Sequence, residues 1–247
     1  MDTLHFERYE YKYFVPEERT DEIRRFIRPY VRLDAHAAQA ADRRYAIYNL
    51  YLDTPNLDFY HACLNGEVDR FKLRIRRYGE EPAPTLYAEL KRKTGSVVRK
   101  RRAAFPANAL HTVLEGSGVP DSAASPQDAK NLMEFAYRRW LSGATPRMLV
   151  TCVREPMRDP DDETAVTVDR DLQYQPTRRA DLLGDACAWQ PIPLSCASGP
   201  ATALVELKYG ARPPAWMDAL IVQLAPWRVS FSKYVAAMNQ CAPGELC

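Results

Sequence analysis

Residues 71–79 read FKLRIRRYG, and in this stretch Lys72, Arg74 and Arg76 occupy every second position. Successive side chains of a β-strand point to opposite faces of the sheet, so the stretch predicts a strand with one cationic face and one mostly apolar face. Three cations on one face repel each other, and they are tolerable on a wet surface or in a site that an anion fills. Guanidinium groups bind phosphate oxygens through paired hydrogen bonds. Taken alone, this strand leaves both interpretations open.

The same alternation recurs in three other stretches of the chain. They are ERYEYKYFV (7–15), LYAELKRK (86–93) and LVELKYG (204–210). Their charged sides carry, in order, Arg8, Glu10 and Lys12; Glu89, Lys91 and Lys93; and Glu206 and Lys208. Strands with wet outer faces would explain any one of these stretches. A closed barrel with a charged lumen explains the whole set better, because it places all the charged faces together.

Composition and charge narrow the classes of partner. The chain has 247 residues, of which 46% are hydrophobic, enough for a sizeable core in one large domain or two small ones. The net charge is only +2, but residues 70–102 contain twelve Lys and Arg and three acids. That segment therefore carries +9, and the remainder carries about −7. Such a concentration predicts a polyanionic partner, for which nucleic acid, inositol phosphate and polyphosphate all qualify.

Several familiar motifs are absent from the sequence. It contains no GxxxxGK[ST] loop, no GxGxxG after a strand, no HExxH pair and no Gly-x-Ser-x-Gly elbow, and its four histidines are scattered. The six cysteines form no CxxC pair, so we expect free thiols in a reducing compartment and no structural zinc. The first residues do not resemble a signal peptide, and no apolar run is long enough to span a bilayer. We therefore expect a cytoplasmic protein.

Hydrophobic periodicity predicts an α+β chain in which helices lie outside an antiparallel barrel of eight or nine strands. We expect strands near 6–15, 45–54, 70–78, 85–93, 96–105, 147–154, 164–169, 203–209 and 228–232. We expect helices near 16–31, 56–64, 108–114, 126–141, 214–224 and 233–240. The Pro-rich segment 171–200 has no assignment.

Three of the predicted strands contain the pattern Glu-x-Lys. The pairs are Glu10 and Lys12, Glu89 and Lys91, and Glu206 and Lys208. A carboxylate two residues from an ammonium group on the same face can hold a divalent cation beside a phosphate, or it can orient the lysine. Cross-strand salt bridges would explain any single pair. Three pairs together with the arginine strand favour a site for a metal ion and a polyphosphate.

The basic stretch VVRKRRAAF (97–105) is ambiguous. Alternation places Arg99 and Arg101 on one face and Lys100 and Arg102 on the other. One pair would continue the cationic lumen, and the other would form a basic rim outside it.

Eight stretches of the chain, in order, resemble the VTC domain, the polyphosphate polymerase domain of the vacuolar transporter chaperone complex and its bacterial relatives. These stretches are ERYEYKYFV, YLDTPNLDFY, KLRIRRYG, ELKRK with VVRKRR, CVREP, VTVDRDL, VELKY and SFSKY. The family belongs to the triphosphate tunnel metalloenzymes, which are related to the CYTH proteins. The resemblance covers residues 6–238. It implies a single domain over residues 1–247, built as an eight-stranded antiparallel β-barrel that binds triphosphate along its axis, with peripheral helices.

The resemblance also implies a set of site residues. The basic wall would consist of Arg8, Lys12, Arg74, Arg76, Lys91 and Arg154, joined most plausibly by Arg99 or Arg101. Lys208 and the late Ser-Lys pair, Ser232 and Lys233, would complete the substrate-binding set. The catalytic residues would be Lys12, Arg74, Arg76, Lys91 and Lys233. Glu206 would hold the metal ion, with Glu10 and Glu89 as helpers.

The chain departs from the family pattern at two positions. Ala165 stands where the family usually has an arginine, so one phosphate clamp is missing unless Arg170 or Arg147 replaces it. Arg8 replaces the first glutamate of the ExExK signature, which matches the polymerase branch better than the hydrolase branches. The chain lacks the membrane segments and the SPX domain of the eukaryotic proteins, so we expect a free-standing version of the bacterial kind.

The activity that the resemblance implies is metal-dependent phosphoryl transfer from ATP to a phosphate or polyphosphate chain, with Mn²⁺ or Mg²⁺ as the cofactor. Two alternatives stay open: hydrolysis of tripolyphosphate or a nucleoside triphosphate, and a non-catalytic module that binds polyphosphate. Nucleic acid is a weaker candidate, because an enclosed lumen excludes a duplex and the sequence shows no interleaving of aromatic and basic residues of the RNA-binding kind. We therefore expect ATP, triphosphate or polyphosphate as the partner.

Overall fold

The computed structural model describes residues 9–40, 42–79, 84–95, 97–116, 123–196 and 199–241. Its long strands are β1 (Tyr9–Val15), β3 (Tyr45–Asp53), β4 (Asp69–Tyr78), β5 (Thr85–Thr94), β6 (Val97–Pro106), β7 (Thr145–Arg158), β8 (Ala165–Pro176) and β12 (Ala203–Tyr209). Its helices are α1 (Glu17–Ile27), α2 (Ala35–Gln39), α3 (Asp58–Leu64), α4 (Leu110–Glu115), α5 (Pro126–Ser142), α6 (Ala215–Leu224) and α7 (Lys233–Met238). Short strands are β2 (Arg32–Leu33), β9 (Gln190–Pro191), β10 (Ser195–Cys196) and β11 (Gly199–Pro200), and two 3-10 turns cover Ala107–Ala109 and Ala225–Trp227.

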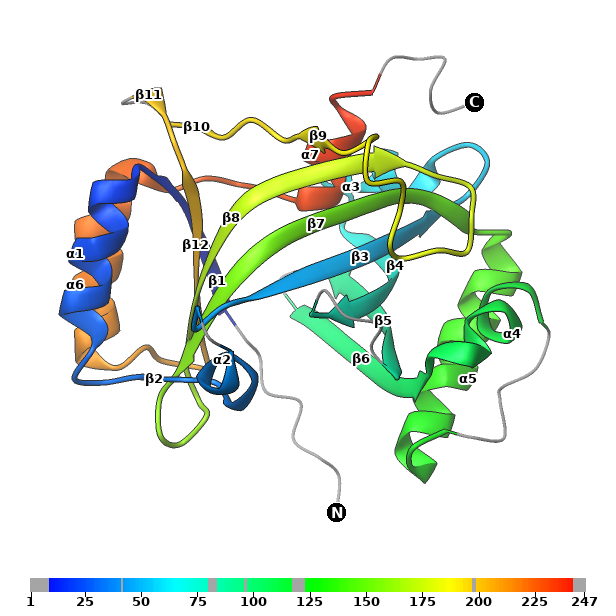
Figure 1. Ribbon diagram of the computed structural model, residues 1–247, viewed down its shortest axis with the longest axis horizontal. Helices are drawn as coiled ribbons and strands as arrows, with labels where there is room; N and C mark the ends of the chain where they lie inside the picture. Colours follow the sequence, from blue (N-terminus) through cyan, green and yellow to red (C-terminus); the bar gives the residue numbers. More distant parts are fainter. Residues whose placement is uncertain are drawn as a thin grey trace. The chain divides into compact units, whose positions relative to one another are not determined.

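The eight long strands form one hydrogen-bonded order, β1-β12-β8-β7-β3-β4-β5-β6, which begins at β1 and ends at β6. Antiparallel register joins β1 to β12, β12 to β8, and each of β3, β4 and β5 to the next strand of the chain. Figure 1 shows the helices beside these strands. The predicted α+β class, with eight antiparallel strands and peripheral helices, is confirmed.

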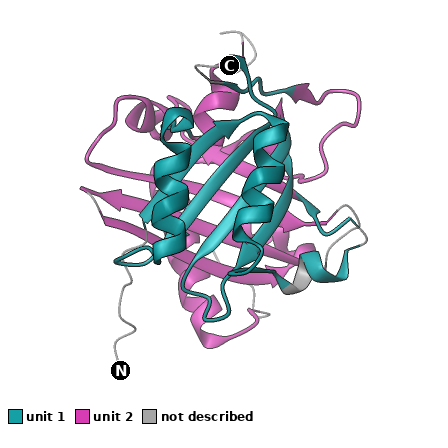
Figure 2. Ribbon diagram, turned by 90° about the vertical axis from the view of Figure 1, so that its left-hand side faces the viewer, with its two compact units in different colours: residues 1–46, 152–172, 191–231 teal, residues 47–151, 173–190, 232–247 magenta. Residues whose placement is uncertain are grey.

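The chain divides into two compact units, coloured separately in Figure 2. Unit 1 comprises residues 1–46, 152–172 and 191–231, and unit 2 comprises residues 47–151, 173–190 and 232–247. Strands β3, β7 and β8 each contribute residues to both units. The single domain that the resemblance implies over residues 1–247 stays a prediction.

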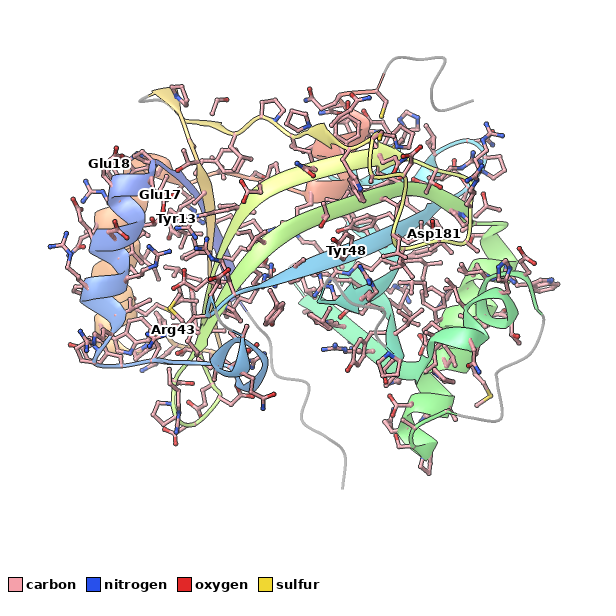
Figure 3. The ribbon with its side chains drawn as sticks, in the orientation of Figure 1. Tyr13, Glu17, Glu18, Arg43, Tyr48 and Asp181 are labelled. Atoms are coloured by element: carbon pink, nitrogen blue, oxygen red, sulfur yellow. The ribbon has the colours of Figure 1, made fainter. Side chains whose placement is uncertain are left out.

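The core of unit 1 lies between its strands and two helices, α1 and α6, which Figure 2 shows side by side across the strands. The apolar side of β1 contributes Tyr13, which is labelled in Figure 3. Ile23 and Ile27 pack from α1, and Met217 and Leu220 pack from α6. Each fully buried apolar side chain of this size stabilises the fold by roughly 1.5–3 kcal/mol. Because the helices cover this side of the strands, the charged residues of β1 and β12 lie on the other side.

The core of unit 2 lies between β4, β5 and β6 and the long helix α5. Leu73 and Ile75 of β4, Phe105 of β6, and Leu132 and Phe135 of α5 belong to one buried cluster. Helix α5 presents these residues because its apolar positions recur at helical spacing, as the sequence predicts. The helix covers one face of the strands and leaves the alternate residues of β4, β5 and β6 on the opposite face.

Some elements differ from the prediction. The strand expected at 228–232 is absent: Arg228 forms one isolated bridge to Tyr13, and Ser232 instead caps α7 by accepting a hydrogen bond from the backbone of Val235. Helix α2 is an element that the sequence does not predict; its N-cap residue is Asp34, whose carboxylate accepts a hydrogen bond from the backbone N–H of Ala37. Strands β7 and β8 extend beyond the predicted 147–154 and 164–169.

Candidate functional site

Strands β4 and β5 place their charged residues on one face of unit 2. The register pairs Lys72 with Lys91 and Arg74 with Glu89. Residues directly opposite each other on antiparallel strands project from the same face. Arg76 follows Arg74 by two positions and therefore shares this face. The alternation that the sequence predicts for β4 and β5 is confirmed.

Strand β6 adds Lys100 and Arg102 to the same face. Its register pairs Lys100 with Lys91, and Arg102 with Glu89. We call this set the arginine face; it consists of Lys72, Arg74, Arg76, Lys91, Lys100 and Arg102, together with Glu89.

The placement of Arg99 and Arg101 corrects the expectation that one of them joins the basic wall. Both lie on the face of β6 opposite to Lys100 and Arg102. Arg101 forms an ion pair of 2.6 Å with Glu134 of α5, and Arg99 is exposed. Alternation divides the four basic residues into two pairs, but the register with β5 decides which pair meets Glu89, and that register is not local information.

Glu89 is the acidic centre of the arginine face, and only 1% of its surface is exposed. Its carboxylate accepts a hydrogen bond of 2.6 Å from Nε of Arg74 and forms ion pairs of 2.8 Å with Lys100 and 3.8 Å with Arg102. Burial alone would raise the pKa of Glu89, but Arg74, Arg76 and Lys100 together hold it well below its usual range. The ionised carboxylate therefore fixes the orientation of its cationic neighbours.

Two tyrosines that the sequence did not place in the site lie among these cations. Arg74 donates to the phenol oxygen of Tyr51 at 3.2 Å, and Arg76 and Arg102 donate to that of Tyr78 at 3.4 and 3.1 Å. Burial alone would raise the pKa of both phenols, but the arginines outweigh it and lower the pKa of each. The alternation of β4 was the available signal for Tyr78, which follows Arg76 by two positions. Tyr51 is placed opposite Arg74 by the register between β3 and β4, which the sequence does not show locally.

Lys100 is the residue of this face whose charge changes close to neutral pH. Desolvation lowers the pKa of Lys100 to about 7, although 44% of its side chain is exposed; Arg74 and Arg76 act in the same direction, and Glu89 opposes them. A bound anion would favour the charged form of this lysine.

The start of α7 reaches the strand that carries the arginines. Lys72 donates a hydrogen bond of 2.8 Å to the hydroxyl of Ser232, which is the N-cap residue of α7. Lys233 is the first residue of that helix and is partly buried. The structure thus brings the predicted Ser232 beside β4, and it places Lys233 one residue further along the chain.

A second charged cluster lies on unit 1, on the side of β1 and β12 away from the helices. The register pairs Glu10 with Lys208 and Lys12 with Glu206. Glu206 is 4% exposed, and its carboxylate forms ion pairs with Lys208 at 2.7 Å, Arg154 at 3.3 Å and Lys12 at 3.5 Å. We call this set the Glu206 face; it consists of Glu10, Lys12, Arg154, Asp169, Glu206 and Lys208.

Arg154 is held on the Glu206 face by Asp169, which the sequence did not place in the site. The carboxylate of Asp169 is fully buried and accepts two hydrogen bonds of 2.6 Å from Arg154. Burial alone would lower the pKa of Arg154, but Asp169 and Glu206 outweigh it and raise the pKa well above its usual value. A fork-to-fork pair of this kind fixes the plane of the guanidinium group.

Ala165 lies on the Glu206 face, since the register pairs it with Lys208. Arg170 cannot replace the arginine that the family usually has there. It lies on the face that α1 covers, where it donates hydrogen bonds of 2.8 and 3.1 Å to Glu17, labelled in Figure 3. That part of the expectation is corrected, whereas the replacement by Arg147 stays a prediction. Arg8 lies outside the described residues.

A family model for the VTC domain matches residues 7–242 of the chain. The chain belongs to the VTC domain family. No curated protein matches it. Among solved structures, that of a Bacillus halodurans protein described as a "putative adenylate cyclase" is similar at 11% sequence identity and a TM-score of 0.50, over 92% of this chain and 95% of that chain. At this identity the likeness shows the fold alone, and together with the VTC match it supports a triphosphate-binding tunnel fold.

The VTC family and its tunnel relatives generally use divalent metal ions, and the two faces differ in how well they fit one. Within the described residues, no three His, Cys, Asp or Glu side chains are grouped so that they could hold a metal ion. Glu10 and Glu206 fit as a partial site, because both carboxylates approach the Lys12 ammonium group, at 3.3 and 3.5 Å. Phosphate oxygens would supply further ligands. Glu89 fits less well than Glu206, because the arginine face contains no second carboxylate beside it, and its ion-pair partners are Arg74, Lys100 and Arg102.

None of the described helices has both the length and the apolar character that a membrane crossing requires. Cys63 and Cys187 are free thiols.

Proposed function

We propose that this VTC domain is a metal-dependent phosphotransferase that passes the γ-phosphoryl group of ATP to phosphate or to a growing polyphosphate chain. Membership of the VTC family and a triphosphate-binding fold support an enzyme that acts on triphosphates. The observation that carries the proposal is the arginine face, where three adjacent strands present Lys and Arg side chains around one buried carboxylate.

The spacing of the arginine face suits an anion with several phosphates. Residues two apart on a strand are about 7 Å apart, and neighbouring strands are about 5 Å apart. Lys72, Arg74 and Arg76 therefore form one row of cations, and Lys100 and Arg102 form another two strands away. Such a grid matches the repeated charges of a linear phosphoanhydride better than a single phosphate group.

The arginines of this face are oriented before any ligand arrives. Arg74 is held by Glu89 and Tyr51, and Arg76 donates to Asn49 at 2.9 Å. Guanidinium groups fixed in this way lose little conformational freedom when they bind, and they stabilise the charge of the transferred group without rearrangement. Removal of one such donor from an enzyme typically slows turnover by about 10²–10³-fold.

Phosphate as the nucleophile is already anionic, so the transfer needs no histidine base. The residues have to bring two anionic groups together and neutralise their charge, which is the usual basis of phosphoryl transfer. We assign this role to Arg74, Arg76 and Lys91, with Lys12 on the Glu206 face and Lys233 at the start of α7. Ser232, Arg154, Lys208, Lys100 and Arg102 would bind the phosphates.

Glu206, with Glu10 beside it, would hold the metal ion. When bound, Mn²⁺ or Mg²⁺ would supply charge neutralisation at the phosphate oxygens. Lys12, Lys208 and Arg154 keep Glu206 ordered on its face.

The deciding experiment is incubation of the purified protein with ATP and Mn²⁺ or Mg²⁺, followed by separation of the phosphate products by length. Chains longer than three phosphates support the proposal. Release of ADP and orthophosphate alone identifies a hydrolase, and binding of tripolyphosphate without turnover identifies a binding module. A chelator control shows whether turnover requires a metal ion.

A further inference from the structure

A buried carboxylate lies at the end of β3, two positions after Tyr51. Asp53 is fully buried and accepts backbone N–H groups from Thr54 at 2.7 Å and from Phe59 and Tyr60 at 2.9 Å each. Its fourth donor is the phenol of Tyr234 in α7, at 2.6 Å. One carboxylate thus joins the end of β3, the start of α3 and the helix α7.

Tyr234 connects this carboxylate to the arginine face. Its side chain is buried, and its ring stacks on that of Tyr51 with centroids 5.0 Å apart and planes 23° apart. The phenol oxygen of Tyr51 in turn accepts the hydrogen bond from Arg74. A chain of direct contacts therefore runs from Asp53 through Tyr234 and Tyr51 to Arg74.

The position of α7 depends on these contacts. The helix has six residues, too few to be stable by itself, so its place is set by tertiary interactions. Ser232 and Lys233 precede Tyr234 directly, and Ser232 accepts the hydrogen bond from Lys72. Fixing the Tyr234 side chain thus fixes the backbone that carries Ser232 and Lys233.

We propose that Asp53 and Tyr234 are positioning residues of the phosphoryl-transfer site: together they hold Lys233 and Ser232 at the start of α7 and fix Tyr51 against Arg74. This inference rests on the proposed function, since it takes Arg74, Lys72 and Lys233 as groups that contact phosphates. Neither Asp53 nor Tyr234 touches the substrate in this arrangement. Both act through the residues that do.

A matched pair of variants tests the proposal. Tyr234→Phe removes the hydrogen bond to Asp53 and keeps the ring. Tyr60→Phe is the control, because the Tyr60 phenol also joins α3 to the end of α7, donating to Asn239 at 2.7 Å, while its ring contacts His61. If displacement of Lys233 by a fraction of an ångström misaligns the transfer, Tyr234→Phe lowers kcat by about 10–100-fold and changes KM less. Tyr60→Phe retains kcat within about twofold.

The measurements are steady-state phosphoryl transfer with ATP, together with circular dichroism to show that both variants fold. Equal kinetic constants for folded Tyr234→Phe and Tyr60→Phe would overturn the proposal. Asp53→Asn is the second variant: an NH2 group replaces a carboxylate oxygen that accepts from two donors, so kcat should fall at least as far as in Tyr234→Phe. An unchanged kcat in folded Asp53→Asn also contradicts the positioning role.

Calorimetric titration with tripolyphosphate separates failure of this inference from failure of the proposed function. If the wild-type chain binds tripolyphosphate but does not turn over ATP, the proposed phosphotransferase activity is contradicted. The inference then stands if Tyr234→Phe weakens binding by about tenfold or more while Tyr60→Phe does not. Equal affinities in the two variants overturn it. A wild-type chain that neither binds nor reacts overturns both.

Discussion

At the scale of single residues, a comparison of Arg99 with Arg102 tests whether the arginine face binds tripolyphosphate. They lie on one strand, carry the same side chain and point to opposite faces. A hydrogen bond to a charged group contributes about 1.5–3 kcal/mol, so Arg102→Ala should weaken tripolyphosphate binding by about 10–100-fold. Arg99→Ala should leave the affinity within about twofold. Calorimetric titration of both variants measures the difference, and equal losses would show that the arginine face is not the binding surface.

Lys100 should give tripolyphosphate binding a pH dependence. Free Lys100, with its pKa of about 7, is largely neutral at pH 8, and an anion beside it raises that pKa. Binding therefore takes up a proton above pH 7, and the affinity falls as the pH rises through this window. Titrations at pH 8 in buffers of different ionisation enthalpy measure the uptake. Lys100→Met should take up less, by up to one proton per ligand, and identical uptake in the two proteins would exclude Lys100 as its source.

At the scale of elements, a polar contact helps to attach α1 to β8. Arg170 is 8% exposed and donates to Glu17 in α1, but the Glu17 side chain is about half exposed, so water screens the pair. Arg170→Met should lower the free energy of unfolding by about 1–2 kcal/mol, measured by urea denaturation. Glu18→Ala, at the exposed neighbour labelled in Figure 3, should change it by less than about 0.5 kcal/mol. Tripolyphosphate binding should survive in both variants, and its loss in Arg170→Met would contradict the placement of Arg170 on the helix-covered face.

The elements also show how far the sequence determines the site. Alternation is a local property, so the shared face of Lys72, Arg74 and Arg76 was predictable from nine residues. The choice between Arg99 and Lys100 was not, because it depends on how β6 pairs with β5. Contacts such as that between Asp53 and Tyr234 join residues far apart in the chain, so they cannot be predicted from the spacing of residues in the sequence.

For the whole molecule, the requirement for a metal ion distinguishes an enzyme from a binding module. Glu206→Gln keeps the size of the side chain and removes its charge. We expect this variant to lose turnover by at least about 100-fold at saturating Mn²⁺ and to bind tripolyphosphate in the presence of chelator at least as tightly as the wild type, because a negative charge is removed. Phosphate release and calorimetry provide the two measurements. Unchanged turnover would exclude Glu206 as a ligand of the metal ion.

The sequence also predicts that the arginine face and the Glu206 face line one cavity, and this stays a prediction. A double-mutant cycle tests it with Arg74→Ala and Lys12→Ala, using tripolyphosphate as the probe. A short anion that contacts both residues should make the two losses in binding free energy non-additive, by about 0.5 kcal/mol or more. Additive losses would contradict a shared cavity.

Helix α5 protects the last strand of the sheet against other chains. Strand β6 ends the strand order, and its outer backbone groups bond to side chains of α5: the N–H of Ala104 to Asp128 and the C=O of Arg102 to Asn131. An uncovered strand edge offers a template for addition of a strand from a second molecule. Replacing Asp128 and Asn131 by alanine should therefore shorten the shelf life of concentrated protein through self-association, which light scattering at 37 °C can follow. The two side chains that attach α5 to β6 would then also prevent the growth of fibrils from this strand edge.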